Sequence, residues 1–73
     1  MSDPFMESEH LARAERHIAE GERRVAAQRE IIARLVEEGR DTALAKKLLQ
    51  SLEQALEQWH VHRRLILESL ARG

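Results

Sequence analysis

The segment Glu38-Gly39-Arg40-Asp41-Thr42 is the only clear interruption in a sequence of 73 residues that otherwise favours helix throughout. Gly39 follows a long helix-favouring run and can take the left-handed backbone conformation that ends a helix. Asp41 precedes a second such run, and its carboxylate can accept hydrogen bonds from the free amides at a helix start, with Thr42 as the alternative cap. A helix end followed so closely by a helix start predicts a short turn between antiparallel helices rather than a kink in one long helix.

The sequence therefore predicts an all-α fold, a coiled-coil-like antiparallel hairpin of two helices. The hairpin forms a single domain of residues 1–73, with a helix over 4–38, a turn over 39–41 and a second helix over 42–71. We expect Asp3 to cap the first helix, with Pro4 at the first helical position, where a missing amide hydrogen costs nothing. Ala, Leu, Glu, Arg and Gln dominate the composition, which is typical of long helices and coiled coils.

Each predicted helix has a row of residues at alternating spacings of three and four, which is the pattern of a coiled-coil seam, the row that faces the other helix. In the first helix the row is Leu11, Ala14, Ile18, Gly21, Val25, Gln28, Ile32 and Leu35, and in the second it is Ala45, Leu48, Leu52, Ala55, Trp59, His62, Ile66 and Ser69.

The position of the turn predicts how the two seams meet. If the chain reverses at Gly39-Arg40, residues whose numbers sum to about 80 lie level. This register sets Gly21, the smallest residue, against Trp59, the largest, and it brings His17 near His62. We expect Gln28 to hydrogen-bond across the seam and to fix the register.

The apolar surface predicted for the two helices exceeds what one hairpin can cover. The second helix adds Leu49, Leu56 and Leu70 beside its seam and Val61, Leu65 and Leu67 near its end, and the first helix adds Ile31, Val36 and an alanine stripe of Ala12, Ala19, Ala26 and Ala33. The alanine stripe is either a second close-packed seam or helix-favouring filler. Because such an exposed strip favours association, we expect two hairpins to form a homodimeric four-helix bundle. The residues expected at its interface are Leu49, Leu56, Trp59, Leu65, Ile66 and Leu70.

Composition limits the classes of function open to the chain. It contains no cysteine, which excludes a disulfide framework and thiolate chemistry. No run approaches the length of about 18 apolar residues that a membrane span needs, and no signal-peptide pattern opens the sequence. We therefore expect a cytoplasmic protein without membrane contact, and the preference for Arg over Lys, with many Ala, suggests a GC-rich bacterial genome. The net charge of −1 provides no general attraction for nucleic acid.

Four histidines are the only plausible chemical groups in the sequence. His10 and His17 lie two turns apart on one face, whereas His60 and His62 point to different sides of the second helix. The spacing Glu-x-x-His, which di-iron bundles use, occurs twice and ends at His10 and at His60, but the predicted register does not bring the two motifs together. We therefore predict no catalytic, metal-binding or cofactor-binding residue, no cofactor and no enzyme activity.

Two alternatives to a role in protein–protein interaction stay open. A nucleic-acid-binding hairpin dimer would use the pairs Arg23-Arg24 and Arg63-Arg64, brought together by two-fold symmetry, to contact phosphates. In outline it would be similar to plasmid-encoded RNA-binding helical-hairpin dimers. A metal-binding bundle would use His17 and His62, or the Glu-x-x-His pairs, across subunits.

The runs His17–Gln28 and Gly39–Ala43, followed by Leu48-Leu49-x-x-Leu52-Glu53, resemble a class of short uncharacterised bacterial proteins that are small and helical. The resemblance covers most of the chain and implies a helical hairpin, but no activity and no site residue. The function we predict is that of a small cytoplasmic adaptor or regulator. It would be a homo-oligomeric helical bundle without enzyme activity, whose partners are a second copy of itself and possible further proteins.

Overall fold

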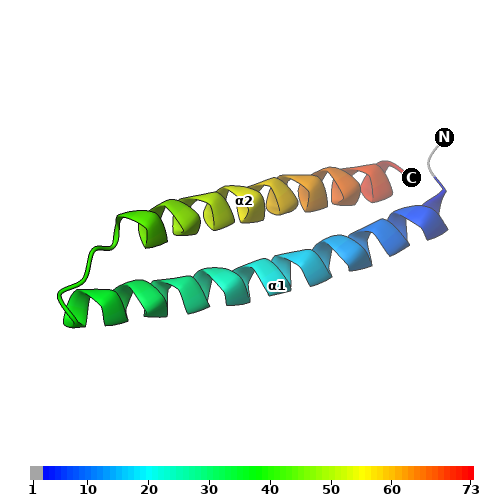
Figure 1. Cartoon of the computed structure of the whole chain (residues 1–73). Helices are drawn as coiled ribbons and strands as arrows, with labels where there is room; N and C mark the ends of the chain where they lie inside the picture. The colour runs from blue at the N-terminus through cyan, green and yellow to red at the C-terminus, as the bar shows by residue number, and fades with distance from the viewer. Residues whose placement is uncertain (1–2) are drawn as a thin grey trace.

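The structure is a computed structural model that describes residues 3–73, and it consists of two long α-helices joined by one turn (Figure 1). Helix α1 spans Pro4–Glu37 and helix α2 spans Ala43–Arg72. The helices run antiparallel in a rod of 55 × 14 × 13 Å, with the first turn of α1 and the last turn of α2 at the same end. The predicted two-helix hairpin is confirmed, and its helix boundaries lie within one residue of their predicted places. Residues 1–2 of the predicted domain lie outside the described residues.

An aspartate caps the start of each helix. The Asp3 carboxylate accepts a hydrogen bond of 3.0 Å from the amide two residues further on, with Pro4 at the first helical position, as predicted. The Asp41 carboxylate accepts a hydrogen bond of 3.0 Å from the Ala43 amide at the start of α2. Thr42 makes no side-chain capping bond, so Asp41 is the residue that caps α2.

The turn ends α1 in the way that Gly39 predicts. Gly39 has a φ of 67°, in the left-handed region that favours glycine. The Gly39 amide donates to the Val36 carbonyl at 3.0 Å, and the Arg40 amide donates to the Leu35 carbonyl at 2.9 Å. These two bonds form a Schellman motif, which satisfies carbonyl groups that a helix end would otherwise leave without partners.

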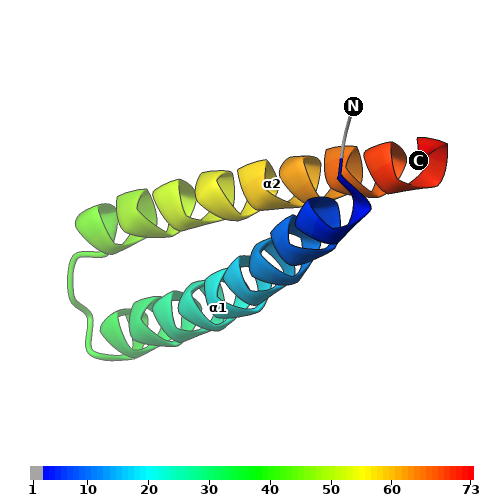
Figure 2. The same ribbon diagram turned by 90° about the vertical axis from the view of Figure 1, so that its right-hand side faces the viewer.

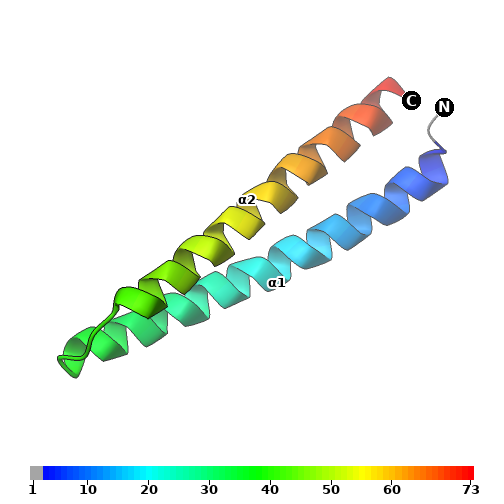
Figure 3. The ribbon, with the colours of Figure 1, turned by 45° about the horizontal axis from the view of Figure 1, so that its top comes forward.

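The two helices cross at an angle instead of lying strictly side by side along their length. The gap between their ribbons narrows toward the turn in Figure 3 and toward the termini in Figure 2. Such a crossing is expected from spacings of three and four, because a row with this repeat drifts slowly around a straight helix.

The register between the helices differs from the predicted one by about one turn. Gly21 lies against Leu56, and His17 lies against Trp59, so level residues have numbers that sum to about 77 rather than about 80. The prediction that Gly21 faces Trp59 is therefore wrong. The helices end symmetrically about position 40, at Glu37 and Ala43, as the predicted register assumed, so the length of the turn does not account for this offset.

The row of α2 that faces α1 also differs from its predicted seam. Three predicted seam residues are exposed, and the residue after each of them is half-buried instead, so that Leu49, Leu56 and Arg63 replace Leu48, Ala55 and His62. Both rows have spacings of three and four, so periodicity does not choose between them. The observed row buries a leucine where the predicted row has Ala55, and burial of the larger apolar side chain is favoured. Gly21 leaves the space that Leu56 fills, since a Cβ added at Gly21 would lie 3.1 Å from Leu56 Cδ1.

The core between the helices is small. Among the described residues, the buried hydrophobic side chains are Ala14, Ile18, Val25 and Ile66. Gln28 is also buried, and its side-chain amide donates to the Ala45 carbonyl oxygen at 3.0 Å. The predicted hydrogen bond of Gln28 across the seam is thus confirmed. It links α1 to the first turn of α2, where it favours the observed register over a shifted one.

Candidate interaction surface

The hairpin has two long sides, and spacings of seven residues assign side chains to each of them. One side, the Glu22 face, includes Glu15, Glu22 and Arg29 of α1 and Glu53 and His60 of α2. The opposite side, the Trp59 face, includes His17, Arg24 and Ile31 of α1 and Leu48, Ala55 and His62 of α2, next to Trp59.

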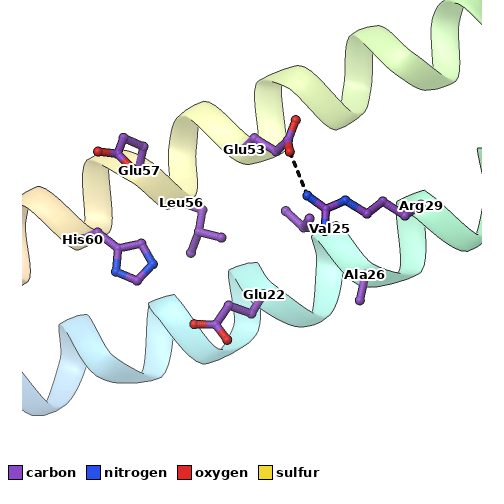
Figure 4. A pocket seen from close by; sticks show the side chains of 8 residues that line it. All are labelled: Glu22, Val25, Ala26, Arg29, Glu53, Leu56, Glu57 and His60. Carbon is purple, nitrogen blue, oxygen red and sulfur yellow. Dashed lines mark hydrogen bonds and ion pairs between the residues drawn. The ribbon is translucent and has the colours of Figure 1, made fainter.

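Charged side chains link the helices across the Glu22 face. Arg29 donates to Glu53 at 3.0 Å, as Figure 4 shows, and Arg63 donates from Nε and Nη2 to Glu15 Oε2, each at 3.4 Å. All four side chains are at least 40% exposed, so water screens both pairs and each contributes about 0–1 kcal/mol. These pairs therefore add little stability, but they connect the two helices on this side.

A shallow, open cavity of about 480 Å³ lies on the Glu22 face beside the Arg29–Glu53 pair. Figure 4 shows the His60 ring turned into the space between the helices, whereas Glu57 points away from α1. Within residues 3–73, no three side chains of His, Asp or Glu lie close enough together to hold a metal ion. The cavity offers carboxylate and imidazole groups to solvent without enclosing a ligand.

Contacts between histidine and tryptophan characterise the Trp59 face. The His17 ring stacks on Trp59 with ring centroids 4.2 Å apart and planes at 12°. His62 meets the same indole edge-on, at 5.6 Å and 73°. The two histidines that we predicted to be close thus contact the same tryptophan from opposite helices. Both histidines are exposed, so this cluster is part of the surface rather than of the core.

Helix α2 has a row of uncharged residues along the Trp59 face. Eight residues at spacings of three and four include no Asp, Glu, Lys or Arg, and all but the last are exposed; these are Leu44, Leu48, Ser51, Ala55, Gln58, His62, Leu65 and Ser69. We call them the uncharged stripe. Because 34% of the chain is charged, a row of this length without charge is a local feature. Its leucines are strongly exposed, at 82% for Leu44, 51% for Leu48 and 56% for Leu65.

The six residues predicted at an oligomer interface lie in different environments. Leu65 is exposed and belongs to the uncharged stripe, whereas Ile66 is 5% exposed and lies inside the hairpin. The other four, Leu49, Leu56, Trp59 and Leu70, are half-buried. Leu44 and Leu48, which the structure leaves exposed, were not among the predicted interface residues. The signal that identifies them is the absence of charge from a helical row.

The arginine pairs considered for phosphate contact are partly neutralised. Arg24 forms an ion pair with Glu20 one turn earlier, and Arg63 pairs with Glu15 on the other helix. One arginine of each pair therefore already has a carboxylate partner, which weakens its attraction for a phosphate.

The two Glu-x-x-His motifs lie in separate parts of the hairpin. Glu7 and His10 approach each other at 3.9 Å in the first part of α1. Glu57 and His60 line the cavity on the Glu22 face. The observed register separates the two motifs by about ten residues along the rod, which is about 15 Å. Within one hairpin they do not form a joint site.

No protein-family model, curated protein or solved structure matches this chain. The resemblance to short bacterial helical hairpins thus stays a prediction. In the part of the chain that the structure describes, neither helix has a stretch apolar enough to cross a lipid bilayer.

Proposed function

We propose that the protein is a small homo-oligomeric helical bundle of the bacterial cytoplasm that works through protein–protein contact, as an adaptor or regulator, and not through catalysis. The observation behind this proposal is the exposure of large apolar side chains on a folded hairpin. Leu44, Leu48 and Leu65 lie on one face, and Ile31 on the same face is 44% exposed.

Exposed leucines favour association because their burial removes apolar surface from water. Full burial of one leucine side chain is worth roughly 1.5–3 kcal/mol, and more than half of that surface is still open on Leu44, Leu48 and Leu65. The hairpin itself buries few side chains, and a chain of this length is near the lower limit for a self-sufficient core. A second copy would supply the missing half of a core.

The arrangement of the charged groups supports a role in assembly. Carboxylates on the Glu22 face pair with arginines of the other helix, and Glu20 pairs with Arg24 along α1. These charged groups already have partners within the hairpin. One side of α2 contains no Asp, Glu, Lys or Arg. Such depletion of charged residues is typical of the central part of protein–protein interfaces.

Light scattering coupled to size-exclusion chromatography tests the proposal. We expect a mass of at least twice the 8.5 kDa of one chain at micromolar concentration. A helical, stable monomer at that concentration would refute the homo-oligomer. A monomer that becomes ordered only when another protein is added would indicate binding to that partner in place of self-association.

A further inference from the structure

We infer that a second copy of this chain packs on the uncharged stripe with its α2 antiparallel to the first, so that Leu48 of each copy meets Leu65 of the other. This inference rests on the proposed homo-oligomeric function and specifies its geometry. It assigns the exposed side of α2, rather than the Glu22 face, as the surface between copies.

The uncharged stripe is complementary to itself when it is reversed. Its eight residues are arranged symmetrically about a point between Leu56 and Glu57 on the helix axis. An antiparallel copy centred there brings together Leu48 with Leu65, Ser51 with His62, Ala55 with Gln58, and Leu44 with Ser69. A two-fold axis makes each of these contacts twice. Apart from the pair of Leu48 with Leu65, each pairing sets a small side chain beside a larger one, as interdigitated packing requires.

The same axis gives a complementary arrangement of charge on α1. Gly21 lies against Leu56, so the midpoint of the stripe is level with the part of α1 around Gly21. Glu20 and Arg24, which border the Trp59 face, lie on either side of this level. Two-fold symmetry about the axis therefore sets Glu20 of the two copies next to each other, with Arg24 of the other copy about three residues, or about 4.5 Å along the axis, beyond each of them. The ion pair that each copy already forms internally can extend into a network of four charges.

The alternative packing, with α2 of one copy on α1 of the other, is less favourable. On this side, α1 presents Glu20 and Arg24, and Arg13 and Arg34 continue the same row. Packing Leu48 and Leu65 against this row would remove the charged groups from water without new partners, which is costly. Antiparallel α2 helices place uncharged residues on uncharged residues and leave the charged rows of α1 facing each other.

The area of the face is sufficient for a specific dimer. The uncharged stripe from Leu44 to Ser69 runs along about 38 Å of helix, and the hairpin is 14 Å wide. Counted across both helices, the face therefore has a footprint of about 530 Å² on each copy and about 1,060 Å² on both, which reaches the size of roughly 1,000 Å² that separates specific interfaces from incidental contacts.

Cysteine cross-linking tests the register directly, because the chain contains no cysteine of its own. Leu48→Cys, Leu65→Cys and Ile31→Cys are prepared as single variants, with an affinity tag on Leu48→Cys alone, and are mixed in pairs and oxidised mildly. Disulfide formation needs Cα atoms within about 7 Å. We expect the mixed dimer of Leu48→Cys with Leu65→Cys to exceed every other disulfide product several-fold. Gln54→Cys, on the outer side of α2, is the control for random collision.

Four results would overturn the inference. A disulfide between two copies of Leu48→Cys would indicate parallel α2 helices, and one between Leu48→Cys and Ile31→Cys would place α2 on α1. A dimer by light scattering with no cross-link above the Gln54→Cys control would reject this face while leaving the homo-oligomeric function intact. A monomer by light scattering would reject both the packing on this face and the homo-oligomeric function. If Leu48→Cys disrupts the helical circular dichroism signal, Ser51→Cys mixed with His62→Cys tests the same register.

Discussion

A double-mutant cycle on Gly21 and Leu56 tests how the two helices fit together. Replacing Gly by Ala inside a helix is expected to stabilise it by about 1 kcal/mol. At Gly21 the new Cβ would lie 3.1 Å from Leu56 Cδ1, so the Leu56 side chain must move by a few tenths of an ångström. Overpacking of this kind costs about 1 kcal/mol or slightly more. We therefore expect Gly21→Ala alone to leave the free energy of unfolding within about 0.5 kcal/mol of the parent protein.

Truncation of Leu56 should release the helix-stabilising effect of Gly21→Ala. Leu56→Ala alone should cost about 2 kcal/mol, because it removes half-buried methyl groups from the seam. In that background the added Cβ has space, so Gly21→Ala should stabilise by about 1 kcal/mol, which gives a coupling energy of about 1 kcal/mol.

The free energies come from urea unfolding followed by circular dichroism at one fixed protein concentration, since association would otherwise shift the midpoints. Trp59→Ala serves as the comparison background, because the predicted register placed Trp59 against Gly21. An equal effect of Gly21→Ala in the parent and Leu56→Ala backgrounds, or a coupling that appears with Trp59→Ala instead, would show that the packing described above is wrong.

Further variants test the turn and the stripe. Gly39→Ala should lower the free energy of unfolding by about 1–2 kcal/mol because of the positive φ, and Gly39→Asn by clearly less; equal losses in urea unfolding would contradict the Schellman turn. Asp41→Ala should cost about 1 kcal/mol in the same assay, whereas Thr42→Ala should cost less, and the reverse order would make Thr42 the cap. Leu48→Glu should shift light-scattering mass toward the monomer, while Gln54→Glu, which adds the same charge on the outer side, should not; dissociation by both would indicate a general charge effect.

Local features of the fold could be predicted from the sequence because neighbouring residues determine them. Gly39 ends α1 through its own backbone conformation, and Asp41 caps α2 through a bond to an amide two residues away. Gln28 was also predicted to bond across the seam, since a buried amide between apolar neighbours needs a partner. These predictions depend on short-range chemistry, which a single sequence contains.

The register and the facing row of α2 could not be predicted in the same way. Leu48 and Leu49 each begin a row with spacings of three and four, and the two rows lie on adjacent strips of one helix. The choice depends on which row fits the other helix, and Gly21 accommodates Leu56 in the observed packing. An offset of three residues in the sum of level residue numbers was enough to move Trp59 from Gly21 to His17. The same choice of facing row leaves Leu48 exposed, and it thereby places the uncharged stripe on the surface.

The distribution of charge would allow a hairpin with a small core to specify the proposed assembly. Arg63 occupies a place in the facing row of α2, yet its guanidinium reaches Glu15 on the Glu22 face. Arg63 lies on the Glu22 side of the facing row, beside Glu15 and His60, which keeps its permanent charge away from the uncharged stripe. A leucine at position 63 would add apolar area inside the hairpin but would remove the link to Glu15.

The ion pairs lie mainly on the Glu22 face, whereas the exposed leucines of α2 lie on the Trp59 face. A second copy would therefore bury more apolar surface on the Trp59 face than on the Glu22 face. In the proposed dimer, the small core of each hairpin would make folding and association interdependent, since each copy would complete the apolar surface that the other leaves open.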